Sequence, residues 1–568
     1  MNYQAELDKL NENQREAVLD DSAACIVNAN VGSGKTTVLI SKIIYLHYAK
    51  AVPYEKMVVL TFTNKAANEI KERLLTLEEN LEVESLKYFG TFHSVALYFL
   101  KECLPVDTLG YTKEFQVIEP EEELELAQRL ITEHKLKIKY KNRLRKRLET
   151  ESVPRYQDDL PLLREKLKAE KVREDVMSFS DLLTSAVTLL SRDNSDKSVK
   201  NTSEKLEWII IDEVQDSDNQ QLEFIHMLKD NHTRLFAVGD PNQVIYSWRG
   251  SAFNVFYNLK ARYDARELTL PINYRSSISI LEAARYFLQN GRELTASRGQ
   301  GQKIMIKEHY DPFSEAIYLA DKVSELHAQG VEYKEIGIFY RLQNQSEILE
   351  QVFLNNEIPC EVPKKKAPVI YGVDYQPEAL EAECDTVKLM TLHASKGLEF
   401  SYVFIIGVNN GLIPLAGNRY EGEEEERRLF FVGMTRAKDY LELSFYTNPV
   451  TPGTFPGPGR FLQMIPDELK QDEGKKQEKI DLHELKKMVL AERQNKSEPQ
   501  KTEQESLGKE KIEQKKTVQQ IEHAKYGIGT VVEEDDVMIT VEFPGYGSKE
   551  FMKGFCDLKW FSITPVEK

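Results

Sequence analysis

The chain has 568 residues, which at roughly 100 to 200 residues per domain is enough for three or four domains. Apolar residues make up 41% and charged residues 29% of it, and this excludes a chain that is disordered throughout or a small disulfide-stapled fold. We expect a cytoplasmic protein, because no apolar run approaches the roughly 18 residues of a membrane span and the first residues lack a signal-peptide pattern. Five scattered cysteines without a Cys-x-x-Cys pair indicate reduced thiols and no zinc site.

The net charge of −17, from 92 acidic and 75 basic residues, argues against indiscriminate binding to a polyanion. One stretch differs from the rest of the chain: from Lys135 to Arg147 there are eight basic residues and no acidic one. A run of this kind is commonly a solvated helix face, and the alternative is a contact with a polyanion.

Apolar runs alternate with helical patterns in the first part of the chain, which predicts a parallel sheet. Residues 101–205 have long charged helical patterns instead, so we expect an all-helical accessory insertion between 1–100 and 206–269 of the first domain. The candidate strands are Ala24–Asn28, Lys56–Phe62, Trp208–Ile211 and Arg234–Val238.

A second α/β domain is predicted over residues 270–466, followed by a charged linker at 467–519. Apolar and polar residues alternate from Val537 to Phe543, which indicates a small antiparallel β-barrel over 520–568. Candidate strands of the second domain are Lys303–Lys307, Ile336–Tyr340, Thr386–Thr391 and Tyr402–Gly407.

A phosphate-binding loop is predicted in CIVNANVGSGKTTVLI, where an apolar run precedes the loop and a helical pattern follows it. Backbone N–H groups at Gly32, Ser33 and Gly34 can cradle phosphates, the Lys35 ammonium can reach the terminal phosphates, and the Thr36 hydroxyl can ligate Mg²⁺. Ala29 stands where the general G-x-x-x-x-G-K-[ST] pattern has its first glycine.

An acidic pair, Asp212 and Glu213, ends the apolar run WIII. Such a pair is costly to bury unless a cation or hydrogen bonds satisfy it. Asp212 is therefore a candidate Mg²⁺ ligand, and Glu213 is a candidate base for the attacking water. The alternative is a solvent-exposed pair at a strand end.

Phosphoryl transfer also benefits from a cation on the departing phosphate, worth roughly 10³ to 10⁵ in rate when it is an arginine finger. The candidates are Arg275 in PINYRSS and Arg436 in FVGMTRAKD. Either arginine taken alone is more often part of a surface salt bridge.

Together these segments resemble the UvrD/Rep-type superfamily 1 DNA helicases, with motifs in family order from Leu10 to about Pro466. The resemblance implies two RecA-like P-loop domains, a helical insertion in the first, and a Tudor-like C-terminal barrel, to which HAKYGIGTVV is similar. The other similar segments are LNENQREAV, TFTNKAANEIKERL, GTFHS, DEVQD, GDPNQVIYSWRGS, NYRSS, TLHASKGLEF and FVGMTRAK.

The resemblance also implies individual roles in ATP binding and hydrolysis, with ATP and Mg²⁺ held between the two domains. It implies that Gln14 reads adenine, Tyr274 stacks on it, and Glu399 contacts the ribose, with Gly397 in the same segment. It further implies that Gln243 couples the γ-phosphate to the DNA site and that Arg275 and Arg436 act as paired fingers. Thr37 stands where many relatives have arginine, so nucleotide contacts there are expected to differ.

Single-stranded DNA is the implied substrate, gripped by stacking of aromatic side chains without reading of sequence. We expect movement in the 3′ to 5′ direction, as in the family, and a DNA contact from the basic run. The implied DNA-binding residues are Phe62, Asn64, His93, Tyr246, Trp248, Arg249 and His393.

The chain departs from the family pattern in one region. Only 115 residues separate Arg275 from Thr391, so the second accessory subdomain is expected to be missing or reduced to a loop at Lys364–Glu383. A strand-separating hairpin is one interpretation of YTNPVTPGTFPGPGR, with Phe455 or Tyr446 at its tip, and an inert loop is the other.

Two functions are therefore compatible with the sequence. The first is an ATP-dependent translocase and helicase that acts on single-stranded and 3′-tailed DNA. The second is a nucleotide-controlled interaction module whose C-terminal barrel docks on RNA polymerase, a repair protein or a defence-system protein.

Overall fold

The computed structural model describes residues 3–78, 80–150, 156–191, 206–245, 254–288, 294–362, 384–416, 420–472, 519–523, 527–534, 538–544, 547–552 and 558–562. The chain divides into two compact units, Met1–Lys475 and Lys476–Lys568. None of the described helices combines the length and hydrophobicity that a membrane span requires.

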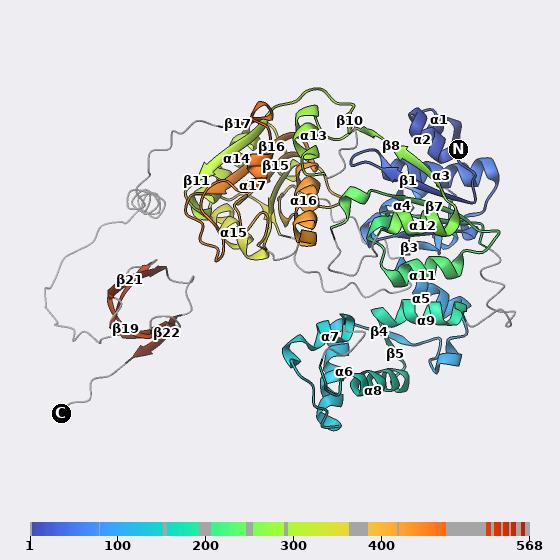
Figure 1. Cartoon of the computed structure of the whole chain (residues 1–568), viewed down its shortest axis with the longest axis horizontal. Coiled ribbons are helices and arrows are strands. Elements are labelled where there is room, and N and C mark those ends of the chain that lie inside the picture. The colour runs from blue at the N-terminus through green and yellow to red at the C-terminus, as the bar shows by residue number, and fades with distance from the viewer. Residues whose placement is uncertain are drawn as a thin grey trace, which may run out of the picture. The chain divides into compact units, whose positions relative to one another are not determined.

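The first unit contains two large sheets in which every strand pair is parallel (Figure 1). We call the first sheet with its covering helices the first lobe and the second sheet with its helices the second lobe. The α/β class expected from the alternating elements is therefore confirmed, and two parallel sheets are consistent with two RecA-like domains.

The first sheet has the strand order β3-β2-β6-β7-β1-β8. Its strands are β1 (Ala24–Ala29), β2 (Met57–Thr61), β3 (Phe89–Thr91), β6 (Trp208–Ile211), β7 (Arg234–Gly239) and β8 (Arg266–Leu270). The helices of this lobe are α1 (Tyr3–Leu7), α2 (Glu12–Leu19), α3 (Lys35–Lys50), α4 (Asn64–Leu77), α5 (Phe92–Tyr98), α9 (Phe179–Ser191), α11 (Asn219–Leu228) and α12 (Val255–Tyr263).

Burial on both faces explains why these strands read as unbroken apolar runs. Ile209 and Ile211 pack into a cluster with residues of α5, α9 and α11, while Ile210 between them packs with residues of α3. A parallel sheet covered by helices on both faces has this pattern. All four predicted strands of this lobe are present, and β3 and β8 are additional strands that the sequence analysis did not identify.

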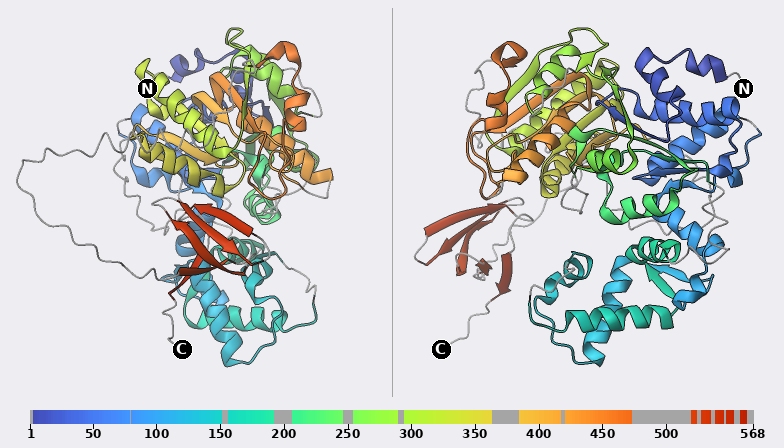
Figure 2. Two further views of the ribbon diagram at one scale, coloured as in Figure 1. Left: turned by 90° about the vertical axis from the view of Figure 1, so that its left-hand side faces the viewer. Right: turned by 45° about the vertical axis from the view of Figure 1, so that its right-hand side comes forward.

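The insertion after β3 contains α6 (Pro120–Glu133), α7 (Leu144–Thr150) and α8 (Leu160–Arg173), which lie together apart from the first sheet (Figures 1 and 2). They share a core that includes Leu130, Leu144 and Leu163. The insertion is not wholly helical, because β4 (Gln116–Ile118) and β5 (Val176–Ser178) form a parallel pair inside it. Three-residue strands are too short to show a period-two pattern in the sequence.

The basic run Lys135–Arg147 is not one solvated helix face. It is irregular until a short 3₁₀ turn at Lys141–Arg143 and enters α7 only at Leu144. The Arg147 side chain is buried, and its Nη1 lies 2.7 Å from Asp158 Oδ2. Part of the run therefore holds the insertion together, while Lys137, Lys139, Lys141 and Arg143 are exposed.

The second sheet has the order β13-β14-β12-β15-β16-β11-β17. Its strands are β11 (Ile304–His309), β12 (Ile336–Tyr340), β13 (Cys360–Glu361), β14 (Val387–Thr391), β15 (Phe400–Ile405), β16 (Ala437–Tyr446) and β17 (Lys470–Asp472). The helices are α13 (Ile278–Arg285), α14 (Pro312–Ala328), α15 (Ser346–Asn355), α16 (Tyr420–Met434) and α17 (Arg460–Met464). The four strands predicted for this lobe are confirmed as β11, β12, β14 and β15.

A short parallel pair, β9 (Ile272–Asn273) with β10 (Thr295–Ala296), lies in the chain between the two large sheets. The loop expected at Lys364–Glu383 in place of a second accessory subdomain lies outside the described residues apart from its flanks, Val362 and Cys384.

The second unit contains one antiparallel sheet of order β21-β20-β19-β18-β22. The predicted alternation corresponds to β20 (Met538–Phe543), in which Val541 and Phe543 are buried. The other strands are β18 (Gln519–His523), β19 (Gly527–Glu534), β21 (Gly547–Met552) and β22 (Leu558–Ser562).

Candidate active site

The carboxyl edge of the first sheet collects most of the predicted site residues. The loop after β1 leads to Lys35, β6 is followed by Asp212 and Glu213, and β7 is followed by the segment with Gln243. Because parallel strands end at one edge, residues far apart in the chain meet there.

The phosphate loop is shaped by two glycines with left-handed backbone. Gly32 has φ +64° and Gly34 has φ +79°, and α3 begins directly after Gly34 at Lys35. Neither position has room for a side chain: a Cβ on Gly32 would lie 2.6 Å from Asn273 Nδ2, and one on Gly34 would lie 2.9 Å from Gln14 Nε2. The start of α3 therefore presents backbone N–H groups that can bind an anion.

Polar atoms at this loop fit a bound triphosphate. Among the described residues, the buried Ser33 Oγ and Asn30 Oδ1 have no hydrogen-bond partner. Buried polar groups without a partner carry a free-energy cost, which a ligand can relieve. The Ser33 hydroxyl, the loop N–H groups and Lys35 are donors that match phosphate oxygens, whereas Asn30 Oδ1 can only accept. The Thr36 hydroxyl and Asp212 carboxylate are the hard oxygen ligands that Mg²⁺ prefers.

Glu213 is turned toward the phosphate loop. Its Oε1 lies 2.7 Å from Lys35 Nζ. Its backbone has φ 50°, a left-handed conformation that costs a non-glycine residue roughly 1–2 kcal/mol. The Gln215 amide donates to the other carboxylate oxygen, so two neighbours orient the Glu213 side chain.

The two carboxylates have opposite electrostatic environments. Burial, and then the neighbouring Glu213, raise the pKa of Asp212. Burial alone would raise the pKa of Glu213 as well, but the Lys35 and Lys396 ammonium groups bring it below the usual range. Glu213 therefore stays ionised, as a base for water requires.

A lysine of the second lobe reaches the same carboxylates. Lys396, in the loop after β14, lies 3.4 Å from Glu213 Oε2, forms an ion pair with Asp216, and donates to the Gln243 carbonyl at 3.0 Å. Burial raises the pKa of Asp216 to about 6 despite this pair. The second lobe is thus linked by charge to the acidic edge of the first.

Arg436 stands directly before β16 and is 2% exposed. Its Nη2 lies 3.5 Å from Gln243 Oε1 of the first lobe, while Nε donates to the Val432 carbonyl at 3.0 Å. Gln243 in turn donates to Asp240 at 2.7 Å. Burial, and then the nearby Arg275, lower the pKa of Arg436 to about 9, so the guanidinium remains charged at neutral pH.

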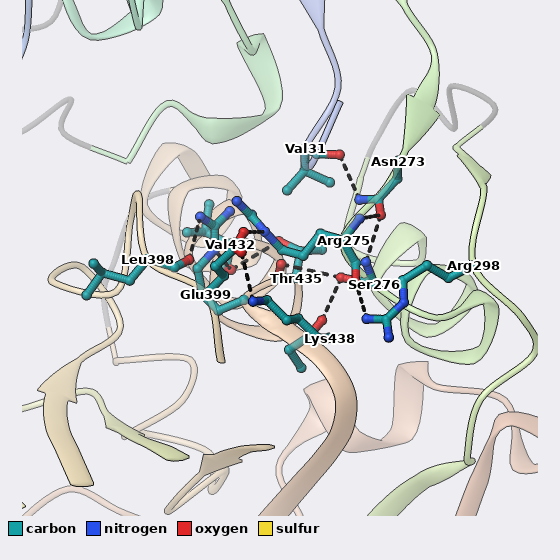
Figure 3. A network of polar contacts seen from close by, with 12 residues as sticks. Val31, Asn273, Arg275, Ser276, Arg298, Leu398, Glu399, Val432, Thr435 and Lys438 are labelled. Atoms are coloured by element: carbon teal, nitrogen blue, oxygen red, sulfur yellow. Dashed lines mark hydrogen bonds and ion pairs between the residues drawn. The ribbon is translucent and has the colours of Figure 1, made fainter. Parts of the chain in front are cut away.

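Arg275 follows β9 and is fixed by several partners (Figure 3). Its Nε donates to Glu399 Oε2 at 2.8 Å, and Lys438 Nζ lies 2.8 Å from the other oxygen of Glu399. Burial opposes ionisation of Glu399, but the hydrogen bond from Lys438 and the charge of Arg275 lower its pKa to about 2. Arg275 and Glu399, predicted separately, therefore form a pair.

The predicted adenine-side residues also meet. Gln14 Nε2 donates to the Ser33 carbonyl at 2.9 Å, and the Asn11 amide donates to the Tyr274 hydroxyl. Tyr274 is 43% exposed, which leaves its ring free to stack. Thr37 and Gly397 are both exposed.

The predicted DNA-binding residues divide into two groups. Phe62 and Asn64 follow β2, His93 follows β3, and His393 follows β14, and all four are partly buried. Burial lowers the pKa of His93. Tyr246, Trp248 and Arg249 lie outside the described residues.

The exposure of Phe455 and Tyr446 distinguishes the two aromatic residues predicted for the tip of a strand-separating hairpin. Phe455 is 63% exposed, whereas Tyr446 is 2% exposed and its hydroxyl binds the buried Glu315 carboxylate. The interpretation of Tyr446 as a hairpin tip is therefore wrong, because the residue belongs to β16 and faces the core under α14.

Sequence reasoning missed Lys396, Asp216, Asn273 and Asn11. Lys396 lies in TLHASKGLEF, and a lysine beside a glycine after an apolar strand was an available signal. No comparable sequence signal identified Asn273 or Asn11, because their hydrogen-bond partners lie far away in the chain.

A phosphate loop, strand-end carboxylates, one arginine of the segment between the lobes and one of the second lobe define a P-loop nucleotide-binding protein of two lobes. Residues 10–264 match the family model of the UvrD/REP helicase N-terminal domain, and residues 268–367 and 374–448 match that of the UvrD-like helicase C-terminal domain. The chain therefore belongs to the UvrD/Rep family of superfamily 1 helicases, which are ATP-dependent DNA helicases.

Several curated proteins are similar to the chain. A probable DNA helicase II homolog of Mycoplasma capricolum is 29% identical over 386 residues, covering 63% of this chain and 52% of that protein. The ATP-dependent DNA helicase Rep of Buchnera aphidicola is 24% identical over 644 aligned residues, covering 81% and 97%. The ATP-dependent DNA helicase PcrA of Staphylococcus epidermidis is 28% identical over 373 residues, covering 62% and 50%. The matched part of this chain thus spans about half the length of two of these relatives.

Proposed function

We propose that the chain is an ATP-driven translocase and helicase that moves 3′ to 5′ on single-stranded DNA. The observation that carries the proposal is that two residues of the first lobe meet two of the second: Lys396 lies against Glu213, which also pairs with Lys35, and Arg436 contacts Gln243. Because groups from both lobes surround one phosphate site, ATP hydrolysis can change the position of one lobe relative to the other. This movement is the physical basis of stepping.

In the proposed reaction the phosphate loop and Lys35 hold the terminal phosphates. Thr36 and Asp212 would hold Mg²⁺, which would neutralise phosphate charge when bound. Glu213 accepts the proton of the attacking water, and Arg275 and Arg436 stabilise the negative charge on the transferred group. Gln243, bonded to Arg436 and Asp240, is placed to report on that charge.

The adenine end is proposed to be held by Gln14 and Tyr274, with Glu399 at the ribose. Gln14 is anchored near the loop by its bond to the Ser33 carbonyl, and the Tyr274 hydroxyl by Asn11. These contacts support selection of ATP, because they already place an amide and a ring beside the phosphate loop.

The DNA is proposed to contact residues that follow β2, β3 and β14, together with Tyr246, Trp248 and Arg249. Stacking on such aromatic side chains is worth roughly 1–3 kcal/mol per base and is tolerant of sequence. The surface lysines of the basic run are proposed to contact phosphates of the same substrate.

We propose the domain limits 1–100 with 206–269, 101–205, 270–466, 467–519 and 520–568, with α9 inside 101–205 packed on the first sheet. We also propose a cytoplasmic location. The C-terminal sheet is proposed to close into a Tudor-like barrel that docks on a protein partner. The exposed Ile528 and Val532 of β19 are candidate contacts for such a partner. Displacement of bound proteins is the activity such docking serves.

The test is ATP hydrolysis by the full chain and by Lys35→Ala, with and without single-stranded DNA, and unwinding of duplexes with a 3′ or a 5′ tail. We expect DNA to stimulate hydrolysis, unwinding only from the 3′ tail, and at least about a 100-fold loss in Lys35→Ala. Stimulation without unwinding would favour a translocase or recruited ATPase. Hydrolysis that is indifferent to DNA would contradict the proposal.

A further inference from the structure

The five residues from Asn273 to Ser277 connect the two lobes at the candidate site. On one side, Asn273 Nδ2 donates to the Val31 carbonyl of the phosphate loop at 2.7 Å, and the Tyr274 N–H donates to the Gly32 carbonyl at 2.8 Å. These two bonds attach the beginning of the segment to the first lobe.

The end of the segment is attached to the second lobe. Ser276 Oγ donates to the Ala437 carbonyl at 2.6 Å, and the Ser277 N–H donates to the Lys438 carbonyl at 3.1 Å. Arg275 lies between the two attachments. Its backbone therefore sits where any relative movement of the lobes has to be absorbed.

The Asn273 side chain links the Arg275 backbone to the phosphate loop. Its side chain is fully buried, and Oδ1 accepts the N–H groups of Arg275 at 2.9 Å and Ser276 at 2.8 Å, so one amide orients the arginine and ties it to the loop (Figure 3). The approach is close, because a Cβ on Gly32 would lie 2.6 Å from Asn273 Nδ2 and 2.9 Å from Arg275 Cβ.

We propose that Asn273 is a positioning residue that holds Arg275 at a fixed place against the phosphate loop. The Arg275 backbone then stays with the phosphate loop, while its guanidinium is paired with Glu399 of the second lobe. Arg436, whose other bonds are to Val432 and Leu398, moves with the second lobe. The inference rests on the proposed function, in which Arg275 stabilises the transferred phosphate.

A double-mutant cycle tests the proposal in the full chain, with ATP hydrolysis measured at saturating single-stranded DNA. Because misplacement of a reacting group by about 1 Å costs roughly 100-fold in rate, we expect Asn273→Ala to lower kcat by about 10- to 100-fold with KM changed less than about threefold. In the Arg275→Ala background the same change should lower kcat by less than about twofold.

The variant Asn273→Ser tests separately the two roles of the amide, which are donation to the Val31 carbonyl and acceptance from the Arg275 N–H. A serine hydroxyl can still accept the N–H two residues on but is too short to reach Val31, so the turn is kept and the tie to the loop is lost. We expect its kcat to fall as in Asn273→Ala. Asn409→Ala, which removes an equally buried asparagine that contacts Tyr446, Phe455 and Gly457, controls for lost stability and should keep basal hydrolysis.

Three outcomes would overturn the inference. They are full kcat in Asn273→Ser, equal fold-losses from Asn273→Ala with and without Arg275, and a loss that appears in KM alone. An unchanged kcat in Arg275→Ala would instead remove the role proposed for Arg275 itself, so failure of the proposed function is distinguishable from failure of the positioning role.

Discussion

At the scale of single residues, the site depends on charges that burial would otherwise suppress. Glu213 and Asp212 are neighbours, yet Lys35 and Lys396 favour the ionised form of the first while burial disfavours that of the second. Pairs of carboxyl groups with pKa values pushed apart are typical of catalytic sites. The assignment of Glu213 as base therefore has an electrostatic reason besides its position after a strand.

Replacement of Glu213 by glutamine tests this assignment. The amide keeps the shape but cannot accept a proton, so we expect kcat for ATP to fall by about 10² to 10⁴ while nucleotide binding is retained. Nucleotide binding is measured by fluorescence of a labelled ATP analogue. Glu207→Gln, just before the same strand and paired with Lys56, is the control and should hydrolyse ATP normally. A normal kcat in Glu213→Gln would refute the assignment.

Glu315 makes a second residue-scale prediction, on stability. Burial raises its pKa to about 8, despite hydrogen bonds from Ser444 and Tyr446. Between the ordinary pKa of about 4.3 and this value the unfolded chain binds fewer protons than the folded one, so this group makes stability fall as pH rises through that window.

Glu315→Gln mimics the protonated carboxyl and should remove that fall. We expect the Tm of the variant minus that of the parent to increase by roughly 2–4 °C between pH 5 and pH 8, measured by scanning fluorimetry. Glu335→Gln, at an exposed position, should show a flat difference. A flat difference in Glu315→Gln as well would mean that the carboxyl is ionised in the folded protein.

At the scale of elements, the helix that carries Gln14 is held by a buried cation. Lys42 of α3 is fully buried, its Nζ donates to the Val18 carbonyl at 3.0 Å and to the Asp20 carbonyl, and the ammonium lies 4.6 Å from the Trp208 ring centroid. A cation at the C-terminus of α2 also interacts favourably with the helix dipole. Helix α3, which follows the phosphate loop, therefore holds the C-terminal end of α2 in place through Lys42.

Lys42→Ala should destabilise the first lobe by about 2–4 kcal/mol, because it leaves buried carbonyls unpaired and a cavity beside Trp208. Denaturant unfolding measures the loss, and hydrogen exchange should show reduced protection of α2. Lys50→Ala removes a lysine of the same helix that pairs with Asp21 at the surface, and it should cost less than about 1 kcal/mol. Equal losses in the two variants would contradict the docking role.

At the scale of the whole molecule, the ATP-site residues and both parallel sheets lie within Met1–Lys475, and the antiparallel sheet lies within Lys476–Lys568. A unit with its own hydrophobic cores is expected to fold without the other. The motor and the proposed docking module are therefore separable in principle.

Truncation after Lys475 tests this separation. We expect the shortened chain to keep DNA-stimulated ATP hydrolysis within about twofold of the full chain, because no described site residue is removed. Capture of RNA polymerase or another partner should be lost. A large loss of hydrolysis with the fold intact would show that the C-terminal unit acts on the motor directly.

The order of motifs and the periodicity of the strands were enough to predict the fold class and to nominate the candidate site residues. Local chemistry determines these features: a loop with Gly32 and Gly34 before a helix presents N–H groups that can bind an anion, and apolar runs such as WIII form buried parallel strands. The short strands β3 to β5 escaped prediction, because three residues carry too little pattern.

The sequence by itself therefore determined the family, the two parallel sheets and the candidate residues at the phosphate loop. Only the tertiary structure shows that Lys396 faces Glu213 and that Asn273 joins Val31 to Arg275. It likewise shows that Tyr446 is buried against Glu315, and that Arg147 is buried in an ion pair with Asp158 inside the insertion instead of lying on its surface. Each of these contacts joins residues whose meeting depends on how strands and helices pack. Local pattern records which side chains are present, whereas packing determines which of them become partners.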